Sequence, residues 1–218
     1  MDPSRPALHV VDLGLQPYAS ALRIQEDLVQ ARKMGTGTDT LLLVEHEPVY
    51  TLGRNADIAH VLIAPEELAR RGIEVVRTGR GGDVTYHGPG QIVGYPILNL
   101  GAIGKGVLGY VESLEHVIIR VLAEFGLTGS TDRVNRGVWI GKNKIAAIGV
   151  RVSRQITMHG FSLNVHTDLS YYGHIIPCGL RDKGVTSMHL LTAGVSMEAV
   201  KSSVVRRFRD VFGYGEEA

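Results

Sequence analysis

Three stretches of the chain carry apolar residues at the spacing of one helix face. They cover about 17–34, 107–125 and 196–212, and the first two are followed by Gly35 and Gly126. Glycine commonly ends a helix because it adopts a left-handed conformation without strain, and the serine that opens the third stretch is a favoured N-cap. The apolar positions are Leu15, Tyr18, Leu22, Leu28 and Val29 in the first, Val107, Tyr110, Val111, Leu114, Val117, Ile118, Val121, Leu122 and Phe125 in the second, and Val200, Val204 and Phe208 in the third. We therefore predict three amphipathic helices, the second of them covering a sheet.

Shorter apolar runs in the first half have the composition of strands. Residues 41–44 are bulky and predict a buried strand, and Pro48, which cannot donate to a sheet ladder, should bend the next segment away from that sheet. A short helix is expected from Pro65 to Gly72, followed by a strand over 73–77. This half therefore mixes strands with helices.

The second half contains strand-like runs joined by turn residues. Residues 137–152 read as two strands joined at Lys142 and Asn143, and 157–165 read as a third strand. Strands connected by such short turns pair in antiparallel fashion. We therefore predict an α+β fold with a mixed, largely antiparallel sheet flanked by helices.

Length, composition and charge narrow the classes of function. A chain of 218 residues fits one domain, 1–218, with a core over about 8–212. No apolar run approaches the roughly 20 residues that span a bilayer, and the N-terminus lacks the pattern of a secretory signal, so we expect a cytoplasmic protein that does not enter a membrane. The net charge of only +1 argues against a nucleic-acid partner.

The only cysteine, Cys178, is the first candidate for chemistry. It stands between a proline and a glycine, a setting that suits a rigidly held and uncrowded thiol. A lone cysteine can equally be a small buried apolar residue, and composition alone does not separate the two interpretations. A catalytic thiolate would require a nearby cation, a histidine or a helix N-terminus to lower its pKa.

Several side chains could supply that cation. By residue type they are Lys142, Lys144, Arg181, Lys183 and the histidines His87, His159, His166 and His174. A lysine has a particular advantage, because its ammonium stabilises a thiolate and its neutral amine can take a proton from an attacking amine. Spacing along the chain does not choose among these candidates.

The glycine-rich stretch 80–91 is the second candidate. Its consecutive glycines could expose backbone N–H groups to a ligand, or the stretch could simply be a bent hairpin, and the residues favour neither reading. It lacks the glycine patterns of nucleotide-binding loops. The chain also lacks the HExxH spacing and cysteine pairs of metal sites and the GxSxG elbow of serine hydrolases, so we expect no metal and no serine hydrolase.

Four blocks, in order along the chain, carry a family resemblance: RGGDVTYHGPGQIVGYP, GVWIGKNKIAAIGVRV, HGFSLNV and IIPCG. Together they closely resemble the octanoyl-[acyl-carrier-protein]:protein N-octanoyltransferases of lipoate synthesis, and the segment TLLLVEHEPVYTLGR fits as a fifth block. The resemblance extends over most of the chain. It implies the fold of the biotin/lipoyl protein ligase catalytic domain, which agrees with the predicted α+β fold.

The resemblance also implies a reaction. Octanoyl would move from octanoyl-acyl carrier protein to Cys178 as a thioester, and then to a lysine ε-amine of a lipoyl domain, either in a 2-oxoacid dehydrogenase complex or in the glycine cleavage H protein. No cofactor and no ATP would be required, because the incoming thioester is already activated. The family pattern identifies Lys144 as the catalytic lysine beside the cysteine.

The resemblance also implies which residues bind the acyl chain and its carbonyl. They are Arg80, Gly81, Gly82, Asp83, Val84, Thr85, Tyr86, His87, Ala147, Ile148, Gly149, Gly160, Phe161 and Ser162. The sequence departs from the family pattern at Tyr172, where phenylalanine is common, and at Ser162, where alanine is common. Both departures add a hydroxyl near the site, so they affect the expected chain-length preference rather than the reaction.

Two alternatives belong to other classes. An ATP-dependent lipoate or biotin ligase on the same fold would need an adenylate-binding segment, and the chain lacks the GRGRxGRxW loop of biotin ligases. A non-catalytic binder of acyl carrier or lipoyl domains would use Cys178 only to fill space. Retention of function after replacement of this cysteine would favour either alternative.

Overall fold

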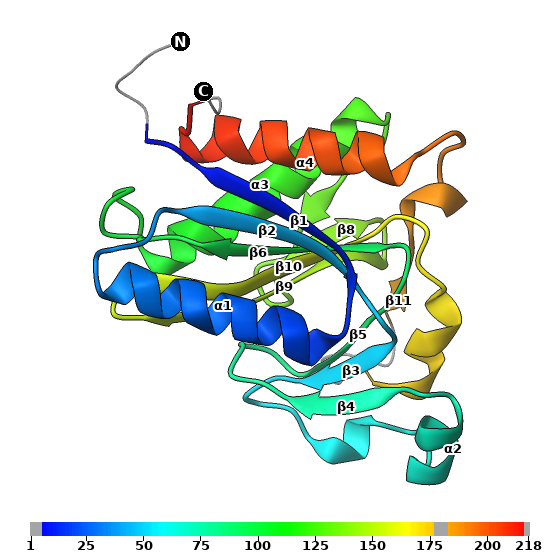
Figure 1. The fold of residues 1–218 in the computed structure, drawn as a ribbon. Coiled ribbons are helices and arrows are strands. Elements are labelled where there is room, and N and C mark those ends of the chain that lie inside the picture. Colours follow the sequence, from blue (N-terminus) through cyan, green and yellow to red (C-terminus); the bar gives the residue numbers. More distant parts are fainter. Residues whose placement is uncertain (1–5, 177–182, 216–218) are drawn as a thin grey trace.

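The computed structural model describes residues 6–176 and 183–215. These residues form two sheets and four α-helices, with short 3-10 turns between them (Figure 1). In spatial order the large sheet contains β1 (His9–Gln16), β2 (Thr40–His46), β6 (Gln91–Ile97), β10 (Ile156–Asn164), β9 (Asn143–Ser153), β8 (Gly137–Ile140) and β7 (Ser130–Thr131), with β11 (Gly184–Val185) beside β9. The small sheet contains β4 (Glu74–Arg77), β3 (Val49–Leu52) and β5 (Val84–His87), and the helices are α1 (Tyr18–Lys33), α2 (Pro65–Arg70), α3 (Val107–Glu124) and α4 (Met197–Phe212).

Most pairings in the large sheet are antiparallel. Strands β2, β6, β10, β9, β8 and β7 pair in this way with their neighbours, whereas β1 runs parallel to β2 and β11 runs parallel to β9. The prediction of a mixed, largely antiparallel sheet flanked by helices is confirmed.

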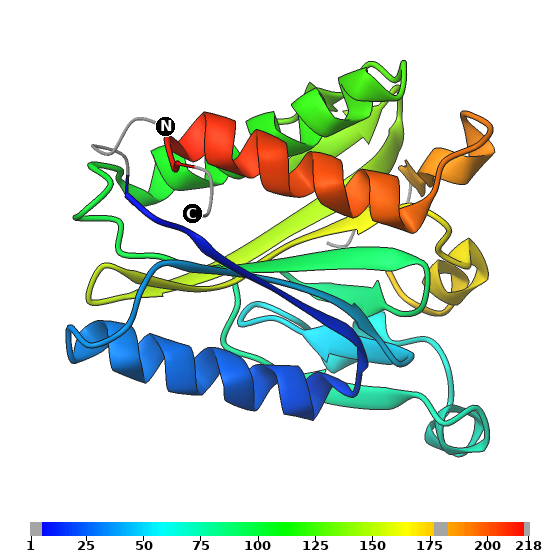
Figure 2. The ribbon, with the colours of Figure 1, turned by 45° about the horizontal axis from the view of Figure 1, so that its top comes forward.

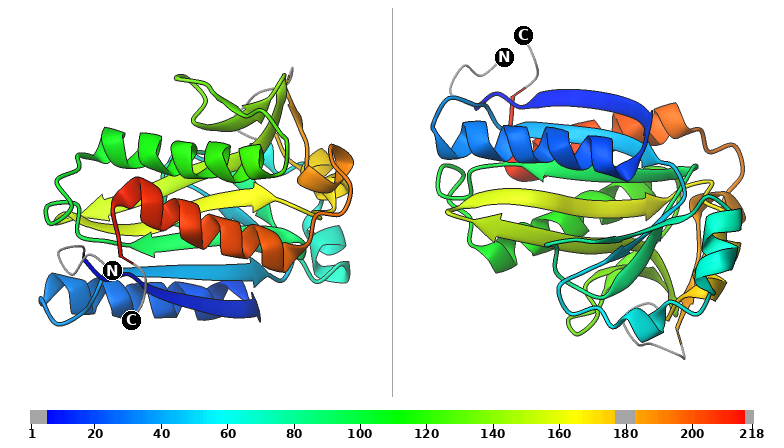
Figure 3. Two further views of the ribbon diagram at one scale, coloured as in Figure 1. Left: turned by 90° about the horizontal axis from the view of Figure 1, so that it is seen from above. Right: turned by 60° about the horizontal axis from the view of Figure 1, so that its bottom comes forward.

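Helices cover both faces of the large sheet. Figure 3 shows α3 and α4 side by side on one face and α1 on the other. The apolar residues of β2 point alternately to the two faces of the sheet. Leu41 and Leu43 belong to the core under α3 and α4, whereas Leu42 and Val44 belong to the core under α1. Because both faces are covered, this strand is apolar at consecutive positions rather than at alternate ones.

The three predicted helices are α1, α3 and α4. In α4, the Ser196 side chain accepts a hydrogen bond from the Ala199 N–H at 3.2 Å, and Gly213 ends the helix with φ of 77°. Ser196 is therefore the predicted N-cap, and Gly213 adopts the left-handed conformation that glycine tolerates best. The apolar stripes of α3 and α4 are buried against each other and the sheet.

The chain leaves the large sheet after β2, as Pro48 predicts, and enters the small sheet at Val49. The small sheet lies on the same side of the large sheet as α1 (Figure 2), near the N-terminal end of that helix, where the Tyr18 and His87 rings stack with centroids 6.4 Å apart. Strand β5 pairs with β3, whereas β6 pairs with β2 and β10. The hairpin reading of the glycine-rich stretch is therefore wrong, because its two strands belong to different sheets.

The sequence did not predict β1, β3, β7 or β11. Leu15, assigned to the stripe of the first helix, lies instead in β1 and is 55% exposed. The turn between β8 and β9 is one residue earlier than expected, since Asn143 already belongs to β9.

Among the described residues, no helix combines the length and apolarity needed to cross a membrane.

Candidate active site

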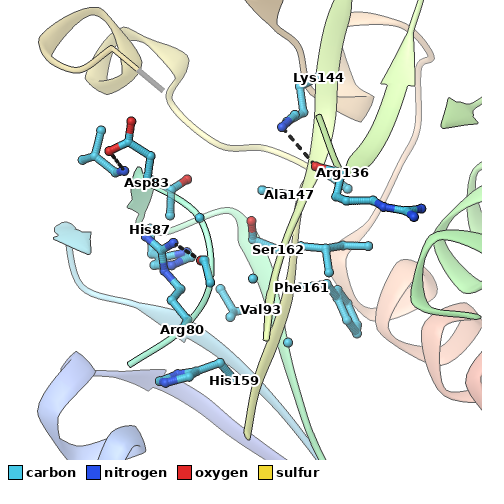
Figure 4. A pocket seen from close by; sticks show the side chains of 18 of the residues that line it. Arg80, Asp83, His87, Val93, Arg136, Lys144, Ala147, His159, Phe161 and Ser162 are labelled. Carbon is cyan, nitrogen blue, oxygen red and sulfur yellow. Dashed lines mark hydrogen bonds between the residues drawn. The ribbon is translucent and has the colours of Figure 1, made fainter. Parts of the chain in front are cut away.

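The central cavity lies between the large sheet and the glycine-rich stretch that leads into β5 (Figure 4). The space between the protein atoms here, including open solvent at the mouth, is about 790 Å³. Every substrate-binding residue that the resemblance implies lines this cavity, with one exception. The exception is Tyr86, whose ring packs on Tyr171 with centroids 4.6 Å apart.

Small residues on β9 and β10 make room for the cavity. Gly149 pairs with Gly160, and Ala147 pairs with Ser162. A Cβ atom on Gly160 would lie 2.1 Å from the backbone oxygen of Gly94, so only glycine fits at this position. At these four positions the sheet therefore presents little more than backbone to the cavity.

The glycine-rich stretch forms the opposite wall. The Gly81 N–H donates a hydrogen bond to the Val150 carbonyl at 3.0 Å, which attaches the stretch to β9. Arg80 is buried, and its Nη2 donates to the backbone oxygen of Thr51 at 2.6 Å and to the Thr51 hydroxyl at 2.8 Å. This arginine therefore fixes the stretch onto β3, a role that the sequence did not predict.

Lys144 lies on β9 beside the cavity, as Figure 4 shows. Its Nζ donates to the backbone oxygen of Arg136 at 3.2 Å and lies 4.8 Å from the centroid of the Trp139 ring. Lys142, two residues earlier, is exposed at the turn and does not line the cavity. The structure thus separates the two lysines of the same block.

Two histidines of the cavity wall are neutral at physiological pH. Burial lowers the pKa of His87 to about 3, with a further contribution from the neighbouring His46, and His87 Nδ1 lies 2.7 Å from Gln91 Oε1. Burial also lowers the pKa of His159 to about 4, and Arg80 acts in the same direction. Neither imidazole carries the positive charge that a thiolate would require.

The other candidate cations are placed away from the cavity or are paired. His166 Nε2 lies 2.8 Å from the Val195 carbonyl oxygen, His174 Nδ1 lies 3.3 Å from the Tyr50 hydroxyl, and neither ring lines the cavity. Lys183 forms an ion pair with Asp132 at 2.6 Å. Arg181 lies outside the described residues.

Cys178 also lies outside the described residues, but its flanks are described. Upstream, the Ile176 N–H donates to the His60 carbonyl at 2.9 Å, and His60 Nδ1 lies 2.6 Å from the Asp83 carboxylate of the cavity wall. Downstream, Val185 pairs with Lys144 in the β11–β9 ladder and lines the cavity. Downstream of the cysteine segment the chain therefore lines the cavity, and upstream it is linked to the cavity wall through His60 and Asp83.

Several lining residues were missed from the sequence. They are Tyr18, Val93, Tyr95, Arg136, Ala146, Asn164 and Val185. Val93, Tyr95, Ala146 and Asn164 lie within the blocks that carry the resemblance, although the resemblance assigned them no role. Tyr18, Arg136 and Val185 lie outside these blocks, so only the topology of the sheets could have indicated them. His159 and Tyr172 had been noted, the first as a candidate cation and the second as a departure from the family pattern.

The two additional hydroxyls have different surroundings. The Tyr172 hydroxyl accepts a hydrogen bond from Gln91 Nε2 at 3.2 Å, and Gln91 Nε2 also donates to Asn164 Oδ1 at 2.9 Å. Tyr172 therefore takes part in a buried polar network at the edge of the cavity. Ser162 is nearly fully buried and lies on the cavity face of β10.

Within residues 6–176 and 183–215, no group of three or more histidine, cysteine, aspartate or glutamate side chains could hold a metal ion.

Solved structures of low sequence identity share this fold. A bipartite lipoate protein ligase from Thermoplasma acidophilum matches with a TM-score of 0.75 at 16% identity, over 97% of this chain and 86% of that one. The biotin protein ligase of Aquifex aeolicus in complex with biotin and ATP matches with a TM-score of 0.55 at 14% identity, over 95% and 70% of the two chains. The predicted biotin/lipoyl protein ligase fold is thus confirmed.

Sequence comparison is more specific. Residues 17–209 match the lipoyl protein ligase A/B catalytic domain. The octanoyltransferase of Alkaliphilus metalliredigens is 48% identical over 95% of this chain and 96% of its own length, and that of Solibacter usitatus is 50% identical over 93% and 91%. The chain therefore belongs to the lipoyl protein ligase A/B catalytic domain family and, within it, to the octanoyltransferases, which are acyltransferase enzymes.

Proposed function

We propose that this enzyme transfers an octanoyl group from octanoyl-acyl carrier protein, through a thioester on Cys178, to the ε-amine of a lysine in a lipoyl domain. In the first step the Cys178 thiolate attacks the thioester carbonyl, the bond between that carbonyl and the carrier sulfur breaks, and the carrier leaves as its thiolate. In the second step the acceptor amine attacks the new thioester, an amide forms, and Cys178 leaves as the thiolate. The amine loses one proton in this step, so a base must lie nearby.

One observation carries the proposal: Lys144 and all but one of the residues implied to bind the acyl chain line a single cavity. The cavity face of the β9–β10 pair offers only small residues there, Ala147, Gly149, Gly160 and Ser162. A saturated chain gains about 0.8 kcal/mol for each methylene that it buries. An acyl group of medium length therefore suits this space.

Lys144 is the residue proposed to assist the cysteine. His87 and His159 are neutral at physiological pH, so they cannot stabilise a thiolate by charge. A lysine ammonium can, and after transfer of a proton the neutral amine can act as the base of the second step. Val185, the partner of Lys144 in the β-ladder, brings the chain that follows Cys178 to this side of the cavity.

The proposed acceptors are lipoyl domains of 2-oxoacid dehydrogenase complexes and the glycine cleavage H protein. The relatives named octanoyltransferase support the octanoyl donor, and the Thermoplasma acidophilum ligase, described together with its E2 lipoyl domain, supports the class of acceptor. The donor thioester supplies the free energy of transfer, so the proposal includes neither ATP nor another cofactor.

Intact-mass measurement after mixing with octanoyl-acyl carrier protein tests this proposal. We expect one octanoyl group on the wild-type chain and none on Cys178→Ala. Lys144→Met should slow adduct formation and transfer by at least about 100-fold, while the matched variant Lys142→Met should behave as wild type. An unmodified wild-type chain, or activity that needs ATP and survives Cys178→Ala, would favour a ligase instead.

A further inference from the structure

A carboxylate interrupts the apolar face of α3. Glu115 is only 1% exposed, although its neighbours on that helix face are apolar core residues. Its Oε1 accepts a hydrogen bond from the Gly137 N–H at 3.0 Å, and its Oε2 accepts one from Arg136 Nη1 at 3.1 Å. Both oxygens act as acceptors, which is the pattern of an ionised carboxylate. A buried charge is unfavourable unless it has such partners, so its position requires an explanation.

The contacts of Glu115 lead directly to Lys144. The N–H of Gly137 and the C=O of Arg136 belong to the same peptide group, and that carbonyl accepts a hydrogen bond from Lys144 Nζ at 3.2 Å. A carboxylate, a peptide group and an ammonium thus form a continuous chain of hydrogen bonds. Each bond in such a chain polarises the next, and the effect is stronger where water is excluded.

The connecting peptide is held tightly between α3 and β9. Gly137 has a φ of 133°, and a Cβ atom there would lie 2.4 Å from the Ala146 carbonyl oxygen and 3.4 Å from Lys144 Cε. Glycine is therefore required for the backbone to approach this closely. Movement of Glu115 would be transmitted to the carbonyl that holds the Lys144 ammonium.

The surrounding charges give Glu115 an electrostatic role as well. Lys183 Nζ lies 4.4 Å from the centroid of the same Trp139 ring that Lys144 contacts, although Asp132 pairs with it. Arg136 also lies beside the cavity. Nearby positive charges disfavour an ammonium, and a carboxylate offsets them.

We propose that Glu115 is a positioning residue for Lys144: through the 136–137 peptide it fixes the Lys144 Nζ beside the cavity and favours its ammonium form. The inference rests on the proposed function, in which that ammonium maintains the Cys178 thiolate. Glu115 does not contact the cavity itself, so it acts through Lys144 and not on the substrate.

The test compares Glu115→Gln with Glu112→Gln. Glu112 lies on the same helix and 3.7 Å from Arg136 Nη2, but it is 53% exposed, so its replacement removes the same charge as a matched control. The first readout is the pH titration of the Lys144 side chain by NMR of its ¹³Cε. The second is the pH dependence of alkylation of Cys178, which is unambiguous because the chain contains one cysteine.

We expect Glu115→Gln to lower the pKa of Lys144 and to slow Cys178 alkylation at neutral pH about three- to tenfold, as for the replacement of a charge-assisted hydrogen bond by a neutral one. Glu112→Gln should leave both readouts unchanged. The kcat of octanoyl transfer should fall in Glu115→Gln while KM for the donor is retained, since the cavity is intact. If this variant does not fold, Glu115→Asp, which moves the carboxylate away from the peptide, should shift both readouts in the same direction.

Equal behaviour of Glu115→Gln and Glu112→Gln would overturn the inference. A separate control, Lys144→Met, tests the proposed function beneath it. If that variant leaves the Cys178 alkylation profile unchanged, the proposed role of Lys144 fails, but the Lys144 titration still reports whether Glu115 controls the ammonium. The two failures are therefore distinguishable.

Discussion

The β9–β10 pair carries side chains of very different size on its two faces. Toward α3, Phe161 and Leu163 are buried in the main core, and Phe161 also borders the cavity. Toward the small sheet, the paired positions hold Gly149 with Gly160 and Ala147 with Ser162. The two faces belong to the same strands, so the difference lies entirely in which residues alternate along them.

This difference separates stability from function within one structural unit. Large apolar side chains on the face toward α3 bury apolar surface, which stabilises the fold. Small side chains on the opposite face leave space, which a ligand can fill. Substitutions on the two faces should therefore affect different measurements.

The largest expected effect is on the core face. Leu163 is fully buried and does not line the cavity. Leu163→Ala should lower the free energy of unfolding by about 2–5 kcal/mol, because it removes buried methylenes and leaves a void. Urea unfolding measures this loss, while kcat at low temperature should remain close to that of wild type. A large loss of kcat in a fully folded variant would contradict the separation of the two faces.

The next largest effect is expected on the cavity face. Ala147→Leu places three more carbons where the acyl chain should lie, so transfer of octanoyl should fall about 10- to 100-fold, as expected for two to three displaced methylenes. Hexanoyl should be affected less, so the ratio of hexanoyl to octanoyl transfer rises within the same variant. Stability should change little, since the side chain enters existing space. An unchanged ratio would mean that the chain does not lie against Ala147.

The buried histidines should make the stability of the protein depend on pH. Burial lowers the folded-state pKa of His46 to about 4, of His87 to about 3 and of His159 to about 4. The unfolded chain binds more protons below about pH 6.5, so stability should fall as the pH drops from about 6.5 toward 5, by up to about 1.4 kcal/mol per pH unit for each histidine. Urea unfolding at several pH values measures this slope.

Two matched variants show whether a buried histidine causes the change of stability with pH. His159→Gln should reduce it, because one buried titrating group is removed. His116→Gln should not, since His116 is exposed on α3. A slope that is the same in both variants would show that the acid sensitivity arises elsewhere.

The smallest effect concerns the departure from the family pattern at Ser162. Ser162→Ala removes one hydroxyl from the cavity face, so octanoyl transfer should change less than about threefold and longer chains should gain slightly relative to octanoyl. Competition between acyl-carrier proteins loaded with different chains measures this ratio. A change of tenfold or more would assign the hydroxyl a direct part in binding.

Elements with a strong local signal were predictable from the sequence. Helix α4 has a capping serine, an apolar stripe and a terminal glycine, and each signal indicates the same structure. Strand β1 was missed because its pairing with β2 is parallel and depends on residues about 30 positions away. The assignment of β5 and β6 to different sheets was missed for the same reason: pairing partners are a property of the whole fold.

The residues of the site were likewise predictable only where a local sequence pattern marks them. Motif blocks identified the residues of 80–87, β9 and β10, because those residues are contiguous. Tyr18, Arg136 and Val185 line the cavity from outside these blocks, and no local pattern marks them. Glu115 reads as part of a helix, and its contact with the 136–137 peptide follows only from the packing of α3 against β8.

The anchors on either side of the Cys178 segment constrain its length. Ile176 is tied to His60 by a backbone hydrogen bond, and Gly184 is in register with Asn143. An insertion or deletion between these anchors cannot be absorbed by sliding the flanking chain, because a one-residue slip of β11 would turn its side chains to the other face of the sheet. Redesign of the segment between Ile176 and Gly184 should therefore leave both anchors in place, so that β11 keeps its register with β9.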